Sequence, residues 1–361
     1  MHIAQIAPLT ESIPPRLYGG TERVVGNLCD ALVQLGHQVT LFAAADARTD
    51  AKLIAVRDRS IRLDPAPLKS DVAAHLSMLA EVRRRAWQFD VMHFHIDLLH
   101  FPVFEHQAHR TVTTLHGRLD LTDLEGAYRH WPQFGLVSIS DHQRTPLPFV
   151  NWLATVPHGL PEHQFSFRER PQPGYLAFIG RISPEKRVDR AIRIARSFGI
   201  PLKIAAKVDR VDLEYFKTTI EPMLSGSDVE FIGEIDERRK PGFLGEARGL
   251  LFPIDWPEPF GLVMIEAMAC GTPVLAFRNG SVPEVIDEGV TGFVVDSEEE
   301  AVRKLGALLA LDRGRVRRRF EDRFTASRMA ADYLKLYKSL IPMPAERRAL
   351  RLVSADTAVA Q

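Results

Sequence analysis

One carboxylate stands in a run of apolar residues where nothing in the neighbouring sequence can bind it. Glu266 lies within the segment 262–269, LVMIEAMA, in which every other residue is apolar. A helix that is apolar on all sides is buried, and a buried carboxylate without partners costs several kcal/mol. Glu266 must therefore accept hydrogen bonds, either from an Arg or Lys of the chain or from the hydroxyl groups of a ligand.

A second carboxylate, Glu258, precedes Glu266 by eight positions. Two prolines and a glycine keep the stretch WPEPFG, residues 256–261, from being helical, so Glu258 lies on a loop and the helix begins near Leu262. At the mouth of the helix, Glu258 is placed to hold a further group of hydroxyls. The backbone amides beside it belong to Gly261, Leu262 and Val263.

Basic residues follow a strand-like run in AFIGRISPEKRV, residues 177–188. Ser183 as the N-cap and Pro184 as the first helical residue predict a helix that begins there, which places Lys186 and Arg187 in its first turn. Cations at that end oppose the helix dipole, and Arg181 adds another positive charge. The cluster indicates an anion such as a diphosphate, unless the nearby acidic residues Glu185 and Asp189 neutralise it.

A pair of glycines, Gly19 and Gly20, stands directly before another predicted helix, with Thr21 as its expected N-cap. Free amides and the dipole at a helix start favour an anion. A turn that merely requires glycine would look the same, and the spacing is not the GxGxxG pattern of dinucleotide-binding proteins.

Strand-length apolar runs alternate with helical patterns along the whole chain, which predicts parallel sheets covered by helices on both faces. The series restarts after the proline-rich and charged segment 168–173. We expect an N-terminal domain over residues 1–167, a second domain over 168–323, a helix over 324–341 and a loose tail over 342–361. Parallel sheets bind ligands outside the carboxyl ends of their strands, so two facing sheets would form one cleft.

The composition narrows the class of protein. The chain has 361 residues, with 46 basic and 46 acidic side chains, and this zero formal charge argues against a nucleic-acid partner. Cys29 and Cys270 are too far apart to suggest a metal site and read as buried apolar residues. No secretory signal or membrane-spanning segment is recognisable, which predicts a cytoplasmic protein.

Four motifs occur in the order YGGTE, GRISPEK, EPFGLVMIE and GSVPEVIDEGVTGFVV. Together they resemble the family-4 retaining glycosyltransferases, the Glu-x7-Glu group, over nearly the whole chain up to about Leu340. The resemblance implies the α/β architecture called GT-B, with two Rossmann-like doubly wound domains facing across a cleft. It also implies a nucleotide-sugar donor held mainly by the C-terminal domain, an acceptor held mainly by the N-terminal one, and a C-terminal helix that crosses back to the first domain.

The resemblance assigns roles residue by residue. Arg181 and Lys186 are similar to the pair that binds the donor diphosphate, and Glu266 to the residue that binds the ribose hydroxyls. The catalytic positions are Glu258, similar to the residue that holds the transferred sugar, and His116, similar to the cleft histidine beside the reacting carbon. The remaining donor-binding positions implied by the resemblance are Gly19, Gly20, Phe260, Gly261, Leu262 and Val263.

One position departs from the family pattern. The strand PLKIAAK, residues 201–207, lacks the usual glycine-rich ending and places Lys207 at the cleft, where it would contact a phosphate or select the acceptor. His93, His95 and His100 lie close together in the sequence, a spacing that could suggest a metal site. Because no paired cysteines or HExxH motif accompany them, we expect cleft-lining or structural histidines rather than zinc ligands. We therefore expect no metal and no cofactor.

Two arginine clusters, residues 83–85 and 315–319, raise the possibility of contact with anionic lipid. Neither shows the amphipathic pattern of a membrane-surface helix, so solvated helix faces are the favoured interpretation.

The combined expectation is a hexosyltransferase that moves a sugar, with UDP-glucose as the inferred donor, to an acceptor hydroxyl with retention of configuration. A nucleotide-sugar 2-epimerase is the main alternative. A nicotinamide dehydrogenase would require the missing GxGxxG pattern, and a non-catalytic sugar-nucleotide-binding regulator would keep Arg181, Lys186 and Glu266 without releasing free nucleotide.

Overall fold

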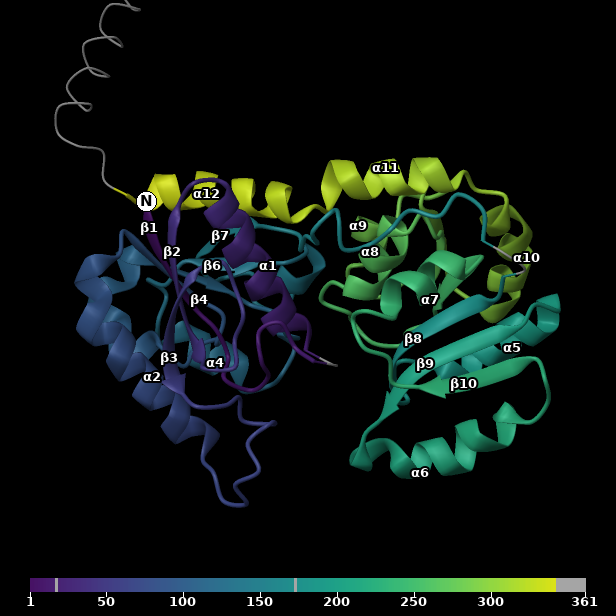
Figure 1. Ribbon diagram of the computed structural model, residues 1–361, viewed down its shortest axis with the longest axis horizontal. Coiled ribbons are helices and arrows are strands. Elements are labelled where there is room, and N and C mark those ends of the chain that lie inside the picture. Colours follow the sequence, from purple (N-terminus) through teal and green to yellow (C-terminus); the bar gives the residue numbers. More distant parts are fainter. Residues whose placement is uncertain (17–18, 172–173, 342–361) are drawn as a thin grey trace, which may run out of the picture.

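The chain folds into two parallel β-sheets, each with helices on both faces, bridged along one side by the C-terminal helices (Figure 1). The computed structural model describes residues 1–16, 19–171 and 174–341. The predicted α/β class with two Rossmann-like sheets is confirmed. The expected loose tail, residues 342–361, lies outside the described residues.

The N-terminal sheet has seven strands in the order β3-β2-β1-β4-β5-β6-β7, all of them parallel. Its central strands β1, β4 and β5 are buried almost throughout, although β5 consists mainly of threonine. The strands are β1 (His2–Ile6), β2 (Gln38–Ala44), β3 (Lys52–Arg57), β4 (Val91–Phe94), β5 (Thr111–Thr114), β6 (Leu136–Ser138) and β7 (Trp152–Thr155).

Edge strand β3 is absent from the sequence-based expectation. Its residues KLIAVR are exposed or half-buried along their length, since the strand lies at the edge of the sheet and pairs only with β2. A strand with this mixed burial lacks the continuous apolar run that marks the central strands.

The C-terminal sheet has six parallel strands in the order β10-β9-β8-β11-β12-β13. Its strand order reverses between β8 and β11, which is where a sheet of this type opens a crevice for a ligand. The strands are β8 (Leu176–Ile182), β9 (Leu202–Val208), β10 (Val229–Gly233), β11 (Gly249–Phe252), β12 (Val274–Phe277) and β13 (Gly292–Val295).

Helices form two apolar layers on each sheet. One face of the N-terminal sheet packs against α1 (Gly20–Gln34) and α12 (Ala326–Leu340). The other packs against α2 (Asp71–Arg85), α3 (Phe101–Phe104) and α4 (Leu124–Arg129). The C-terminal sheet is covered by α5 (Val188–Phe198) and α10 (Glu298–Leu309) on one face, and on the other by α7 (Lys240–Glu246), α8 (Leu262–Ala269), α9 (Val282–Val285) and α11 (Arg313–Arg323). The short α6 (Leu213–Tyr215) follows β9.

Two predicted helix starts are wrong. Helix α1 begins at Gly20 with Gly19 as its N-cap, so Thr21 lies inside the helix and does not cap it. Helix α5 begins only at Val188, because Arg187 adopts the left-handed conformation, with φ of 52°, and ends the preceding turn. Lys186 therefore lies on a turn before α5 rather than in its first helical turn.

Helix α12 belongs to the N-terminal sheet although it follows the C-terminal one in the chain. Tyr333 and Tyr337 are buried in its contact with α1 and the sheet. The Tyr337 hydroxyl accepts a hydrogen bond from the Gln5 side chain at 3.1 Å, and the Tyr333 hydroxyl lies 2.7 Å from Thr114 Oγ1. Apolar burial and two polar contacts thus tie the end of the described chain back to its beginning.

The arginines of α11 are not all on a solvated face. Arg317 is largely buried and donates to the carbonyls of Phe165 and Ala269, at 2.9 Å and 2.5 Å. The expectation of a fully solvated cluster at 315–319 is wrong at this position, because α11 packs across the junction between the domains. Among the described helices, none is both long and apolar enough to span a bilayer.

Replacing Met329 in α12 tests this docking. Met329 is fully buried, and Met329→Ala is expected to lower the free energy of unfolding by about 2–5 kcal/mol through lost packing and a residual cavity. Lys335→Ala on the same helix, where the side chain is 79 % exposed, is expected to change it by less than about 0.5 kcal/mol. Urea denaturation measures both, and equal losses would contradict a specific docking of the buried face.

Candidate active site

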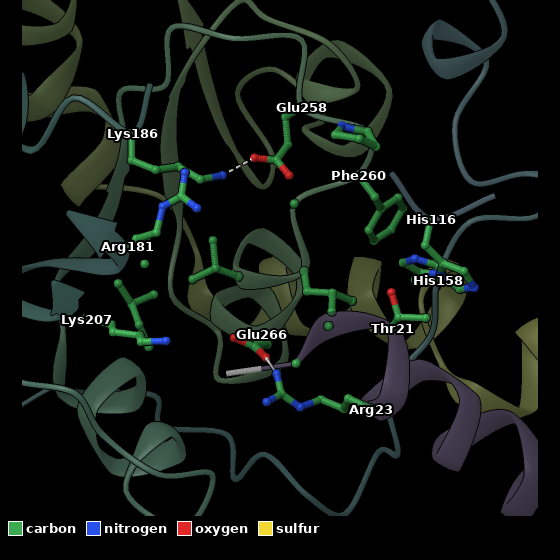
Figure 2. Close-up of a pocket in the computed structure, with 18 of the residues that line it drawn as sticks. Thr21, Arg23, His116, His158, Arg181, Lys186, Lys207, Glu258, Phe260 and Glu266 are labelled. Atoms are coloured by element: carbon green, nitrogen blue, oxygen red, sulfur yellow. Dashed lines mark hydrogen bonds and ion pairs between the residues drawn. The ribbon is translucent and has the colours of Figure 1, made fainter. Parts of the chain in front are cut away.

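The facing edges of the two sheets enclose a cavity of about 700 Å³. All the catalytic and donor-binding positions expected from the sequence line it, although they come from both domains and from segments more than 200 positions apart (Figure 2). They are Gly19, Gly20, His116, Arg181, Lys186, Lys207, Glu258, Phe260, Gly261, Leu262, Val263 and Glu266.

Glu266 lies on α8 at the floor of this cavity and is only 2 % exposed. Its Oε1 accepts from Arg23 Nη1 at 3.0 Å and from Lys240 Nζ at 2.9 Å. Burial raises the pKa of Glu266, but the charges of Lys240 and Arg23 and their hydrogen bonds outweigh burial and leave the pKa below its usual value. In this structure, cations of the chain satisfy the carboxylate.

The two cations also contact another acid. Glu237 pairs with Arg23 and, at 2.8 Å, with Lys240. Arg23 belongs to α1 of the N-terminal domain, whereas both acids and Lys240 belong to the C-terminal domain. Two positive and two negative groups therefore balance in one network that joins the domains across the floor of the cavity.

Arg23 and Lys240 were not identified from the sequence. Arg23 carried a usable signal, since the two residues that follow it in α1, Val24 and Val25, are buried and apolar. No sequence signal marked Lys240, because only the folded chain brings α7 beside α8.

Glu258 and Lys186 form a second ion pair on the opposite side of the cavity (Figure 2). The same Glu258 oxygen accepts from Trp256 Nε1 at 3.0 Å, and Lys186 Nζ lies 4.7 Å from the centroid of the Trp256 ring. Trp256, which the sequence analysis also missed, thereby holds both charged groups in place.

The loop that carries Glu258 is supported from behind by the motif GSVPE. Ser281 donates its backbone amide to the Glu258 carbonyl and its hydroxyl to the Phe260 carbonyl, both at 2.9 Å. Gly280 has a φ of 57°, and a Cβ there would lie 2.2 Å from the Glu258 carbonyl oxygen. A side chain at position 280 would therefore displace Glu258.

Positive charge gathers at the ends of the central strands of the C-terminal sheet. Arg181 on β8 and Lys207 on β9 are directly paired positions of these neighbouring strands. Arg181 contacts Glu185 and Asp212 only at 3.4 Å, and Lys207 contacts Asp209 at 2.8 Å. Together with Lys186 they present three cations to the cavity.

Two helix starts also open into the cavity. Gly20 begins α1 and Gly261 precedes α8, and a Cβ on Gly20 would lie 3.4 Å from Leu262 Cδ1. The two domains therefore approach closely where both helices begin. This end of a helix carries a partial positive charge that favours an anion.

Histidines line the wall on the N-terminal side. His116 Nε2 lies 2.9 Å from His95 Nδ1, and the His116 ring stacks on His158 at 5.3 Å. His158 in turn contacts the Phe260 ring at 4.9 Å, although the sequence analysis did not select it. Burial lowers the pKa of His116 to about 3, so its imidazole is neutral at pH 7.

The three histidines considered as metal ligands, His93, His95 and His100, all lie in hydrogen-bonded or aromatic surroundings. His93 contacts Tyr337 and Thr114, and His100 stacks on Phe94 at 3.7 Å. Within residues 1–16, 19–171 and 174–341, no group of three or more His, Cys, Asp or Glu side chains is placed to hold a metal ion.

Two protein families match the chain in succession. The family described as Glycosyltransferase Family 4 matches residues 18–148, and Glycosyl transferases group 1 matches residues 161–324. The chain belongs to the family-4 glycosyltransferases.

Similar proteins agree with this assignment. This chain is 27 % identical over 349 residues to a phosphatidyl-myo-inositol mannosyltransferase of Mycobacterium leprae. The match covers 88 % of this chain and 89 % of the mannosyltransferase. It is also 27 % identical over 173 residues to an uncharacterized 41.2 kDa protein in the cps region of Klebsiella pneumoniae, which covers 45 % of this chain and less than half, 46 %, of that protein. Anabaena HepE, solved in complex with UDP and glucose, has the same GT-B fold with a TM-score of 0.73, at 17 % identity and with 94 % and 100 % of the two chains covered.

The domain-bridging network yields a stability prediction. Arg23→Met should leave Glu266 and Glu237 sharing one cation, and breaking a buried pair on one side costs about 3–5 kcal/mol. Arg278→Met, which removes an exposed pair with Asp296, should cost less than about 1 kcal/mol. Chemical denaturation compares the two variants, and a similar small loss in both would show that the bridge contributes no more than a surface pair.

Proposed function

We propose that this glycosyltransferase moves a hexose from UDP-glucose to an acceptor hydroxyl with retention of anomeric configuration. The observation that carries the proposal is the arrangement of charge in one cavity. Three cations and two helix starts line the same cavity as two carboxylates, Glu258 and Glu266. A sugar linked to a nucleoside through a diphosphate offers the matching groups, with hydroxyls at both ends and negative charge in the middle.

Glu266 is the proposed ribose-binding residue. Among the described residues, the two that donate to it both do so at Oε1, and a carboxylate has about four acceptor sites on its two oxygens. The ribose hydroxyls would donate to Oε2 while Arg23 and Lys240 keep the group ionised. The internal cations and the ligand thus have complementary roles at one carboxylate.

Lys186 is the proposed link between the sugar and the diphosphate. Its ammonium group has three donors, and the pair with Glu258 uses one of them. The others can bind phosphate oxygens when the donor enters. Arg181, Lys207 and the amides at the starts of α1 and α8 would share the charge that develops on the departing diphosphate.

Glu258 would hold hydroxyls of the transferred sugar. Its ion pair with Lys186 and the hydrogen bond from Trp256 hold it in a fixed position as an acceptor. Same-face attack by the acceptor, whose proton passes to the leaving phosphate, would account for retention without a covalent intermediate. His116, neutral at pH 7, would contact the sugar from the opposite wall.

Two similarities support these details over the alternatives. A protein of the same fold has been solved with UDP and glucose. The similar proteins include a phosphatidyl-myo-inositol mannosyltransferase and a glycogen synthase, which does not favour a 2-epimerase. The acceptor would enter from the N-terminal side, where Thr10, Glu11, Arg62 and Arg118 line the cavity.

A panel of nucleotides and nucleotide sugars tests the proposal first. A ligand at a hundred times its dissociation constant stabilises the protein by about 2.7 kcal/mol, so UDP-glucose and UDP should raise the melting temperature where GDP and ADP analogues do not. Release of UDP should depend on an added acceptor. Stabilisation by another base would correct the donor, and isomerised sugar without acceptor would support the epimerase.

Lys186→Ala is expected to weaken binding of UDP about 10–100-fold, because it removes a charged hydrogen bond worth about 1.5–3 kcal/mol. Uridine should bind almost unchanged, and isothermal titration measures both. Lys203→Ala, on the same sheet but paired with Glu230 away from the cavity, is the matched control. Equal loss of UDP and uridine would contradict contact between Lys186 and the diphosphate.

Glu258→Gln is expected to lower kcat by about 100-fold or more, the usual cost of removing a fixed electrostatic group at a reacting centre. UDP affinity should be kept or improved, since Lys186 loses its competing partner. Initial rates of UDP release and UDP titration measure the two effects, with Glu246→Gln at an exposed position as control. Unchanged turnover would remove Glu258 from the proposed site.

A further inference from the structure

A continuous series of hydrogen bonds runs from the cavity through the N-terminal sheet to helix α12. It starts at His116, whose Nε2 lies 2.9 Å from His95 Nδ1. His95 Nε2 lies 2.8 Å from Gln5 Oε1, and Gln5 Nε2 donates to the Tyr337 hydroxyl at 3.1 Å. These side chains come from β1, from the ends of β4 and β5, and from α12, so only the folded chain brings them together.

The series continues beyond Tyr337 through His93 and Thr114 and returns to the same helix at Tyr333. The Tyr337 hydroxyl lies 2.7 Å from His93 Nδ1, and His93 Nε2 lies 2.7 Å from Thr114 Oγ1. Thr114 Oγ1 then lies 2.7 Å from the Tyr333 hydroxyl. All of these groups are buried, so each must find its partner within the protein.

The amide of Gln5 gives the series a direction. An amide donates only through its nitrogen and accepts only through its oxygen. With the nitrogen on Tyr337, the oxygen receives the proton of His95 Nε2. A neutral imidazole has one N–H, so His95 Nδ1 is an acceptor and must receive the proton of His116 Nε2.

Both histidines are neutral at physiological pH. Burial lowers the pKa of His95 well below its usual value and that of His116 to about 3. Each ring therefore carries one proton, and the position of that proton is a choice between two nitrogens. Which nitrogen is protonated follows from the bond that the other one makes.

The remaining nitrogen of His116 is the one that a ligand would meet. His116 lines the cavity, and its Nδ1 is buried without a hydrogen-bond partner among the described residues. We propose that Gln5 and His95 are positioning residues, held by Tyr337, that fix His116 as its Nε2–H tautomer, so that Nδ1 accepts a hydrogen bond from a substrate hydroxyl. The hydroxyl partner rests on the proposed function, whereas the tautomer does not.

The tautomer of His116 determines which ligand groups this wall of the cleft can bind. An Nδ1 lone pair binds a hydroxyl as an acceptor and cannot donate to a carbonyl or phosphate oxygen. The reverse tautomer would do the opposite. A helix at the end of the described chain thus sets the polarity of one wall of the cleft through two intervening groups, Gln5 and His95.

NMR of the ligand-free, full-length protein labelled with ¹⁵N-histidine tests the tautomer directly. The chain has 13 histidines, and the signals lost in His116→Gln identify those of His116. We expect a protonated Nε2 and an unprotonated Nδ1 at pH 7.5. A proton on Nδ1 would mean that the amide of Gln5 is rotated and the whole series runs the other way, which would overturn the proposal.

Two tyrosines on α12 provide matched variants for the positioning role. Tyr337→Phe removes the hydroxyl that orients Gln5, so both amide orientations become equivalent and His116 should show a mixture of tautomers. Tyr333→Phe makes the same change at the far end of the series and should leave a single tautomer. An unchanged spectrum in Tyr337→Phe would overturn the role of the helix, and the unsubstituted protein decides the tautomer even if this variant proves unstable.

Kinetic measurements distinguish this positioning role from a purely structural contact. Tyr337→Phe should lower kcat/KM about threefold to tenfold, the effect of one neutral hydrogen bond, without changing UDP affinity, whereas Tyr333→Phe should change neither. Failure of every nucleotide sugar to react would refute the proposed function and leave the NMR result standing. The predicted tautomer with no kinetic difference between the two variants would overturn the contact with a substrate hydroxyl.

Discussion

A buried carboxylate between two domains is the constraint on which this molecule depends. Glu266 lies in a helix with no polar face of its own, and its charge is kept only because Arg23 and Lys240 reach it. One of these cations crosses from the other domain, so the acid is fully paired only when the domains face each other. The electrostatic requirement of one side chain thus helps to fix how the domains are arranged and where the cavity forms.

The same interface explains why the chemistry gathers where it does. Parallel strands place their following loops at one edge of each sheet, and the close approach of Gly20 to Leu262 brings the starts of α1 and α8 together. Helix α12 returns to the first domain, so the end of the described chain packs against the domain in which the chain begins (Figure 1). Its tyrosines also contact His93 behind the cavity, so the element that secures the fold contacts the groups that shape the site.

Much of the fold and the predicted set of cavity residues could be read from the sequence. Buried parallel strands have continuous apolar runs, and the charged or glycine-containing motifs follow them directly. Edge strand β3 was missed because its half-exposed residues lack that run. The predicted start of α5 was wrong because Arg187 takes a left-handed conformation. The preceding Ser183 and Pro184 do not indicate this conformation.

By itself the sequence determined the two α/β sheets, the loop that carries Glu258 and the need of Glu266 for partners. These follow from local rules: apolar periodicity, proline and glycine at loops, and the cost of burying a charge. Only the tertiary structure decided which partners answer that need. Arg23, Lys240, Trp256 and His158 contact the predicted residues across long sequence separations, and such pairings arise from the packing of whole elements, which no local pattern encodes.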